Sequence, residues 1–275
     1  MFAALKKYLI IPKLVRLSAA APKDPLAAWD QYWGKVQTTG ARGEVLWDSG
    51  DDHEMLGYVQ ALKTHLDPEL PIIDVGCGNG TFSRRLARYF PHVLGVDVSA
   101  NAVARARKDF DSRTPDEPDN VSYLVCDMTA SGAGAPVAAA LAAAGGGNEA
   151  NIFIRGVLHV LDRSDQAALA RNLRPLMGSR GRIFLVETNF PGNAVEYVSH
   201  LGATPRKIPA PLEAAIRGLP MPGRFGAAQR EKAFPASHWD VIEDGPTTIE
   251  TVPMKSATQA ELIPGYFAVL RATAG

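Results

Sequence analysis

One segment, residues 71–99, constrains the fold of this 275-residue chain more than any other. It begins with a short apolar run, Ile72–Val75, which has the length and composition of a buried parallel strand. A turn with three glycines follows, and then a stretch with apolar residues at helical spacing that ends at Pro91. A second apolar run, Val93–Asp97, ends in an acid. This strand–turn–helix–strand pattern predicts an α/β fold with a nucleotide-like ligand at the carboxyl ends of the strands.

The glycine spacing and two acids indicate which ligand this turn binds. Gly76, Gly78 and Gly80 alternate with other residues, whereas the dinucleotide fingerprint has its third glycine or alanine one position later. Asp74 stands two residues before the first glycine, where its charge would repel a pyrophosphate and attract an ammonium group. Asp97 can accept hydrogen bonds from both hydroxyls of a ribose. An amine, an adenosyl group and a ribose together describe S-adenosylmethionine.

A resemblance to class I S-adenosylmethionine-dependent methyltransferases rests on two motifs, Asp74-Val-Gly-Cys-Gly-Asn-Gly and Val96-Asp97-Val98-Ser99. It is specific from about Ile72 to Glu187. It implies a doubly wound α/β fold, with a seven-stranded, mostly parallel sheet, an antiparallel C-terminal hairpin and helical cap elements. It also implies S-adenosylmethionine as the cofactor. The expected cofactor-binding residues of this segment are Asp74, Gly76, Cys77, Gly78, Gly80, Asp97 and Val98.

Two later strand ends continue the pattern. Val121–Cys126 is the third expected strand, and Asp127 and Met128 follow it. The resemblance implies that Asp127 hydrogen-bonds the adenine amine and that Met128 packs on the ring, although a carboxylate in this position can also cap a helix. The fourth expected strand, Asn151–Ile154, runs into Arg155. Arg155 departs from the family pattern, and we assign it to the cofactor-binding residues.

His159 is the candidate general base. In the family, the end of the fourth strand lies under the transferred methyl group, and a histidine there is common in methyltransferases of small molecules. A neutral imidazole can take a proton from a hydroxyl or phenol near neutral pH. The alternative is a histidine that holds the start of the helix Arg163–Leu176 by hydrogen bonds. Glu187 ends the fifth expected strand, Arg182–Glu187, at the edge where substrate groups approach.

The chain divides into two expected parts. Residues 1–70 are expected to form an N-terminal helical cap or lid, and residues 71–275 the cofactor-binding α/β domain. The stretch 190–235 is rich in proline and glycine, which predicts an insertion that contributes to the substrate wall. Three segments near the C-terminus have strand patterns and are expected to build the closing hairpin: Trp239–Glu243, Thr248–Val252 and Tyr266–Arg271.

Aromatic residues ahead of the glycine turn are candidates for a lid. In this family, segments before the turn often close over cofactor and substrate, and aromatic faces favour a sulfonium cation. We select Tyr32 and Trp33, with ordinary core packing as the alternative. Arg42 is a candidate partner for the cofactor carboxylate, and the alternative is a solvated surface arginine. Asp51–Leu66 has helical spacing and is the last expected helix before the first strand.

Composition excludes several classes of partner. The chain has 29 lysine and arginine residues and 29 aspartate and glutamate residues, so its formal net charge is zero. No overall positive charge is therefore present to attract nucleic acid or an acidic membrane. The two cysteines fit reduced thiols in a cytosolic protein. Residues 1–23 contain no acid, and their charges interrupt any apolar run far short of a membrane span. We expect a helix there that packs on the domain; contact of residues 1–20 with a membrane surface is the alternative.

The sequence therefore predicts a cytoplasmic S-adenosylmethionine-dependent methyltransferase of a small molecule, acting on an oxygen nucleophile, with nitrogen, sulfur and carbon acceptors still open. Two alternatives belong to other classes. One is a non-catalytic adenosyl-binding regulatory module, and the other is a nicotinamide-dependent oxidoreductase, which Asp74 and the glycine spacing disfavour. The histidines show no paired ligand spacing, so no metal is expected. No nucleic-acid partner is expected either, and the pattern indicates no oligomeric state.

Overall fold

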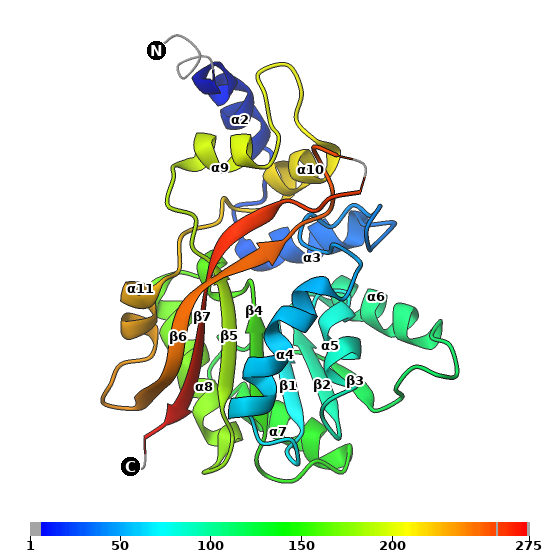
Figure 1. The fold of residues 1–275 in the computed structure, drawn as a ribbon, viewed down its shortest axis with the longest axis vertical. Helices are drawn as coiled ribbons and strands as arrows, with labels where there is room; N and C mark the ends of the chain where they lie inside the picture. The colour runs from blue at the N-terminus through cyan, green and yellow to red at the C-terminus, as the bar shows by residue number, and fades with distance from the viewer. Residues whose placement is uncertain (1–6, 257, 274–275) are drawn as a thin grey trace.

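The computed structural model describes residues 7–256 and 258–273, in which seven strands form one sheet (Figure 1). The strands are β1 (Ile72–Val75), β2 (Val93–Asp97), β3 (Val121–Val125), β4 (Asn151–Arg155), β5 (Ile183–Thr188), β6 (Trp239–Glu250) and β7 (Leu262–Ala272). Their spatial order is β3-β2-β1-β4-β5-β7-β6. β1 to β5 are parallel, and β7 is antiparallel to both of its neighbours. The predicted fold class is therefore confirmed.

Helices cover both faces of the sheet. On one face lie α4 (His53–His65), α5 (Thr81–Leu86) and α6 (Ala100–Asp111), and on the other lie α7 (Gly134–Ala143), α8 (Arg163–Met177) and α11 (Ala227–Ala233). The remaining helices lie toward the carboxyl ends of the parallel strands: η1 (Lys7–Ile10), α2 (Ile11–Ser18), α3 (Pro25–Lys35), η2 (Leu158–Val160), α9 (Ala194–His200) and α10 (Ala210–Gly218). Figure 1 shows α2, α9 and α10 gathered beyond the sheet at that end.

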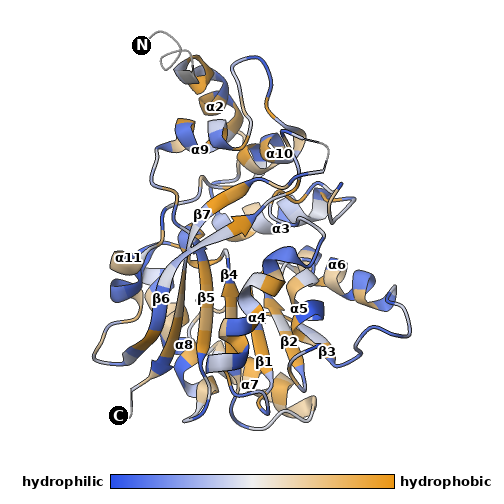
Figure 2. Cartoon of the chain, in the orientation of Figure 1, coloured by the Kyte–Doolittle hydropathy of each residue, from blue (hydrophilic) through white to orange (hydrophobic). Residues whose placement is uncertain are grey.

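Strand alternation divides the core into two clusters. In β1, Ile72 packs with α4, α5 and α6, whereas Ile73 packs with α7 and α8. In β4, Phe153 belongs to the first cluster and Ile152 to the second. Both clusters draw on near-continuous apolar strands, which Figure 2 shows as hydrophobic along their length and which doubly covered parallel sheets require. The position of a residue along its strand thus decides which helical layer its side chain meets.

Only part of the predicted 1–70 cap lies over the strand ends. The buried side chains of α4, such as Met55 and Leu62, belong to the same core cluster as Ile72. α4 is therefore a layer of the α/β domain, while η1, α2 and α3 form the cap. The division into residues 1–70 and 71–275 remains a prediction, although α4 lies within the first part and packs with the second.

The N-terminal segment packs on the domain, as expected for its described part. Ile10 and Leu17 are buried, and α2 contacts α10. Pro12 stands in the first turn of α2, where its missing N–H is harmless. Leu9 and Val15 are 70% and 62% exposed on the other side. Residues 1–6 lie outside the described residues, so membrane contact by residues 1–20 stays a prediction. Within the described residues, no helix is long and apolar enough to cross a bilayer.

The closing hairpin differs from its predicted form in one respect. The expected strand 239–243 and the start of the expected strand 248–252 belong to one strand, β6, which ends at Glu250 and pairs with β7 across a register shift between Val241 and Glu243. Gly245 and Pro246 interrupt the strand pattern in the sequence. β6 is the edge of the sheet, where a proline removes no ladder bond on the outer side, so the strand continues through both residues.

Candidate active site

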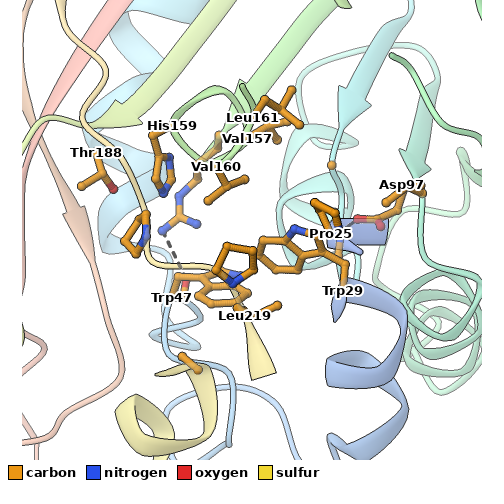
Figure 3. Close-up of a pocket in the computed structure, with 18 of the residues that line it drawn as sticks. Pro25, Trp29, Trp47, Asp97, Val157, His159, Val160, Leu161, Thr188 and Leu219 are labelled. Atoms are coloured by element: carbon orange, nitrogen blue, oxygen red, sulfur yellow. Dashed lines mark hydrogen bonds between the residues drawn. The ribbon is translucent and has the colours of Figure 1, made fainter. Parts of the chain in front are cut away.

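A cavity of about 500 Å³ lies at the carboxyl ends of β1, β2, β4 and β5 (Figure 3). Two parts of its wall differ in chemistry. The cofactor half comprises Gly76, Gly78, Asp97, Val98, Asp127 and Met128, at the ends of β1, β2 and β3. The apolar chamber comprises Leu46, Val198, Leu212, Ile216, Ile249 and Ile263, from the segment between α3 and α4 and from α9, α10, β6 and β7. Because β4 and β5 lie between these groups in the sheet, the cavity runs across its edge from one half to the other.

The glycine turn is shaped for close approach. Gly76 and Gly78 have φ angles of 72° and 54°, in the left-handed region that favours glycine. A Cβ atom on Gly76 would lie 2.3 Å from Cγ2 of Val157, and one on Gly78 would lie 2.8 Å from Cζ2 of Trp33. The loop can therefore take this form only with glycine at these positions. It leaves backbone, with no side chain, facing the cavity.

Asp97 joins the glycine turn to the end of β2. Oδ2 accepts a hydrogen bond from the backbone N–H of Gly78 at 2.8 Å, and Oδ1 accepts one from Ser99 N–H at 2.9 Å. Burial raises the pKa of this carboxyl group above its usual range. Each carboxylate oxygen has a second acceptor direction after these bonds, so both can receive a ribose hydroxyl. The residue thus fits the predicted role.

Asp127 and Met128 also line the cavity where they were expected. Oδ1 of Asp127 accepts hydrogen bonds from the backbone N–H and the hydroxyl of Thr129, at 2.9 and 2.7 Å. The carboxylate therefore closes the turn after β3 with one oxygen, which leaves the other for a ligand. The two roles considered for Asp127 are compatible in this geometry.

Three predicted cofactor residues, Asp74, Cys77 and Gly80, do not line the cavity. Asp74 shares the strand face of Ile72, so it points beneath α5, where Ser83 Oγ donates to its Oδ2 at 2.6 Å. Burial raises the pKa of Asp74 to about 7. This geometry favours a structural role under the glycine turn over direct attraction of the cofactor ammonium.

His159 faces the cavity and is held from behind by Glu187. Nδ1 of the imidazole lies 2.6 Å from Oε2 of the carboxylate, which is fully buried. Glu187 also accepts hydrogen bonds from three backbone N–H groups, those of Val157, Leu158 and His159, at 2.8 to 3.1 Å. The carboxylate is thus stabilised as the anion, and it assigns the proton to Nδ1. Nε2 is left as an acceptor and has no partner among the described residues.

Glu187 therefore does not touch the cavity itself, contrary to its predicted place as a substrate contact. Nor does His159 hold the start of α8. Asp162 caps that helix, with its side chain accepting from Asp165 N–H at 2.9 Å. The geometry accordingly favours the general-base interpretation of His159 over the capping one.

Arg155 lines the cavity but is engaged mainly by the protein. Its position in β4 directs it toward α4, where the carboxylate of Glu54 binds Nε and Nη2, the latter at 2.6 Å. Nη2 also donates to the carbonyl oxygen of Trp47 at 3.2 Å, the bond drawn in Figure 3. Glu54 accepts further bonds from the hydroxyl of Tyr58 and the N–H of Glu250. This buried ion pair joins β4 to α4, and its hydrogen bond to Trp47 extends it to the lid. Direct cofactor binding by Arg155 remains a prediction.

The lid contains more tryptophan than expected. Trp33 lines the cavity as predicted, and Trp29 and Trp47 line it too. Tyr32 lies behind them, stacked on Trp47 with ring centroids 5.5 Å apart, so it supports the lid without facing the ligand. Arg42 is exposed and away from the cavity, which agrees with the solvated alternative.

A polar contact fastens this lid over the cofactor half. Asp30, on α3, accepts hydrogen bonds from Ser99 Oγ at 2.8 Å and from Asn101 N–H at 3.0 Å. Both donors belong to the start of α6, directly after Asp97. The backbone hydrogen bond from Asn101 is the main reason that the pKa of Asp30 lies below its usual range. Figure 3 shows Pro25 and Trp29 of α3 beside Asp97.

Sequence reasoning missed three residues of this site: Trp29, Glu54 and Thr188. Trp29 stands one helical turn before Trp33, a spacing that places both on one face. Glu54 interrupts the apolar face of α4 that also carries Tyr58 and Leu62, and an acid on such a face needs a buried partner. Thr188 follows Glu187, and no pattern in the sequence indicated that it belongs to the site.

Known proteins share this fold. Residues 72–181 match the family model described as a methyltransferase domain. Curated relatives, described as uncharacterized methyltransferases of Mycobacterium bovis and Mycobacterium tuberculosis, are 46% identical over 39 residues, which is 14% of this chain. The match spans about a fifth of the length of those relatives.

Two solved structures extend the likeness beyond the matched domain. A SAM-dependent methyltransferase from Anabaena variabilis is 26% identical, with a TM-score of 0.75 over 92% of this chain and 97% of that one. The magnesium protoporphyrin IX methyltransferase of Synechocystis, solved with bound SAH, is 13% identical over 98% of this chain and all of that one, with a TM-score of 0.51. The predicted resemblance to class I methyltransferases is confirmed, and S-adenosylmethionine is the cofactor that these findings support.

Proposed function

We propose that this protein transfers the methyl group of S-adenosylmethionine to an oxygen nucleophile of a small molecule, because residues 72–181 match the model of a methyltransferase domain and the chain has the fold of a SAM-dependent methyltransferase. The His159–Glu187 pair is the observation that carries the proposal. It stands between the cofactor half and the apolar chamber, with Nε2 directed to neither a protein donor nor a protein acceptor. An oxygen acceptor needs such a base, because its proton is poorly acidic.

Different residues of the cofactor half suit different parts of the cofactor. Asp97 would hold the ribose, Asp127 and Met128 the adenine, and the bare backbone at Gly76 and Gly78 would let the ligand approach closely. The bound cofactor supplies an electrophilic methyl group on a sulfonium centre. The tryptophan faces of the lid favour that cation and exclude water from it.

The proton moves to His159 in the proposed reaction. Nε2 would accept the proton of the acceptor hydroxyl as that oxygen takes the methyl group that the bound cofactor would supply. The resulting imidazolium is stabilised by Glu187, which already holds Nδ1–H. Positioning of the hydroxyl opposite the sulfur supplies much of the remaining acceleration.

Methyl transfer to matched acceptors tests this proposal. We would incubate the protein with S-adenosylmethionine carrying a labelled methyl group and with a phenol, an aniline and a thiophenol that bear the same alkyl substituent. The expected product is the methyl ether, formed in preference to the methylated amine or thioether. Preferred labelling of the amine or the thiol would contradict the oxygen assignment.

The same assay separates the two alternative classes. Tight binding of S-adenosylhomocysteine, with no methyl transfer to any acceptor, would favour the non-catalytic adenosyl-binding module. Binding of a nicotinamide cofactor in place of S-adenosylhomocysteine would favour the oxidoreductase. Asp97 is a carboxylate suited to a ribose in either case, so the glycine spacing and the direct titration decide between them.

A further inference from the structure

The apolar chamber contains almost no group that could bind a charged substrate. Its defining residues are all aliphatic, and each is at most 5% exposed. Arg155 is the only lysine or arginine among the residues that line the described cavity. Glu54 neutralises it through two of its nitrogens. A buried carboxylate on a substrate would therefore meet an ion pair of zero net charge.

The acids that line the cavity add to this exclusion. Asp127, Asp162 and Asp165 stand on the cofactor side, after β3 and β4. The pKa of Asp165 is raised, first by burial and then by the charges of Asp162 and Asp127, which shows how close these acids are. Such a field suits a cationic cofactor and repels an anionic acceptor.

Three side chains that line the cavity from η2, β5 and α9 have a polar atom with no hydrogen-bond partner among the described residues. They are Nε2 of His159, Oγ1 of Thr188 and the hydroxyl of Tyr197. Thr188 ends β5 beside the end of β4, and Figure 3 shows its side chain near that of His159. A single hydroxyl on the acceptor could thus be received by an acceptor and a donor at once.

We propose that the methyl acceptor is an uncharged, predominantly apolar molecule whose one reactive hydroxyl lies between His159 and Thr188, with its hydrocarbon body in the apolar chamber. This inference rests on the proposed function and names the class of its substrate. Thr188 acts as a positioning residue for the hydroxyl. Burial of the hydrocarbon body against Leu212, Ile216 and Ile263 supplies the affinity.

A series of 4-alkylphenols tests the inference by binding alone. Three of the four tryptophans of the chain line the cavity, so quenching of intrinsic fluorescence reports occupancy. We would titrate the protein, saturated with S-adenosylhomocysteine, with 4-ethylphenol through 4-hexylphenol. Affinity is expected to rise about fourfold for each methylene until the chamber is filled. An affinity that does not change with chain length would overturn the inference.

A charged analogue of similar size gives the second arm. The compound 3-(4-hydroxyphenyl)propanoate has the same phenol head as 4-butylphenol and ends in a carboxylate. We expect it to bind at least about 100-fold more weakly, because its charge would be buried without a free partner. Affinities of the two compounds within tenfold of each other would contradict an uncharged acceptor.

Variants at Ile216 locate the bound hydrocarbon. Ile216→Phe fills part of the chamber, so the gain per methylene should stop at a shorter chain, whereas Ile216→Ala should extend it to a longer one. Ile242→Phe, at a 40% exposed position on β6, is the matched control and should leave the series unchanged. S-adenosylhomocysteine affinity should not change in any of them. If Ile216→Phe fails to fold, Ile216→Ala carries the test, and an unchanged series there would overturn the assignment.

Methyl transfer measured on the same compounds keeps the two proposals distinguishable. Graded binding without transfer would contradict the proposed function and support this chamber as an apolar binding site. Transfer to hydrophilic acceptors, with no gain along the alkyl series, would support the proposed function and overturn the inference.

Discussion

The cofactor half and the apolar chamber are held in place by different forces. In the cofactor half, hydrogen bonds fix the parts: Asp97 binds the backbone of Gly78 and Ser99, and Asp127 binds that of Thr129. The chamber is held by side-chain packing, with Leu212 and Ile216 in a core cluster that also includes Phe184. Directional bonds specify one ligand geometry, whereas apolar packing tolerates changes of size and shape. The residues of the cofactor half accordingly lie close together along the chain, in short motifs. The residues of the apolar chamber come from segments that lie far apart in the sequence.

Removal of the base at the junction of the two halves should have the largest effect. His159→Ala is expected to lower kcat for methyl transfer by about 10²- to 10⁴-fold, the usual contribution of a general base. S-adenosylhomocysteine affinity, measured by calorimetry, should stay near that of the parent. His238→Ala, at an exposed position, serves as the control. If kcat does not fall, proton removal is not part of the reaction, and the junction only positions the acceptor.

The buried ion pair between β4 and α4 should come next. Arg155→Met leaves the buried carboxylate of Glu54 without its partner, so we expect the free energy of unfolding to fall by about 3–5 kcal/mol in urea titrations. Adding Glu54→Gln should restore much of that loss. Arg180→Met breaks an ion pair in which the arginine side chain is 48% exposed, and should change stability by at most about 1 kcal/mol. Equal effects at Arg155 and Arg180 would contradict the bridging role.

Loss of Asp97 should weaken ligand binding in the cofactor half and leave ligand binding in the apolar chamber nearly unchanged. Asp97→Ala is expected to weaken S-adenosylhomocysteine binding by about 1.5–3 kcal/mol, the range for hydrogen bonds to a charged group. Binding of a neutral alkylphenol in the chamber should change far less, which would sharpen the contrast between the halves. Asp116→Ala, on the exposed loop before β3, is the matched control. Unchanged calorimetric affinity in Asp97→Ala would remove the ribose role.

The smallest effect concerns the acid under the glycine turn. Burial raises the pKa of Asp74 to about 7 from an ordinary value of 3.8, so the folded state holds this proton more tightly than the unfolded state. The stability that this proton provides is complete below about pH 4 and is lost as the pH rises through 7. Between pH 5 and pH 8 the loss should be about 2.6 kcal/mol, at roughly 1.4 kcal/mol per pH unit below pH 7.

Asp74→Asn has no such proton to lose. We therefore expect the variant to match the parent near pH 5 and to exceed it in stability at pH 8, as measured by urea unfolding at each pH. Asp116→Asn should follow the parent at every pH. A difference between Asp74→Asn and the parent that is the same at pH 5 and pH 8 would show that Asp74 does not titrate in this range.

Much of the fold and the cofactor half could be predicted from local patterns. The strands β1 to β5 are short apolar runs that end in recognisable turns, and their alternation with helices leaves few topologies. Gly76, Gly78 and Asp97 lie within 22 residues of one another along the chain, so the motif and the site nearly coincide. Even here, Asp74 was expected at the ligand. Side chains alternate between the two faces of β1, and Asp74 therefore points away from the cavity, toward α5, where Ser83 donates a hydrogen bond to it.

The sequence by itself determined the fold class, the glycine turn and the carboxylate at the end of β2, because each depends on residues close together along the chain. Tertiary structure alone decided that Glu54 pairs with Arg155, that Glu187 orients His159, and that α9, α10 and the hairpin enclose an apolar chamber. His159 and Glu187 lie 28 residues apart along the chain, and Glu54 and Arg155 lie 101 residues apart. A buried charge or an apolar helix face indicates only that a packing partner is needed. Which residue becomes that partner is decided by the tertiary structure.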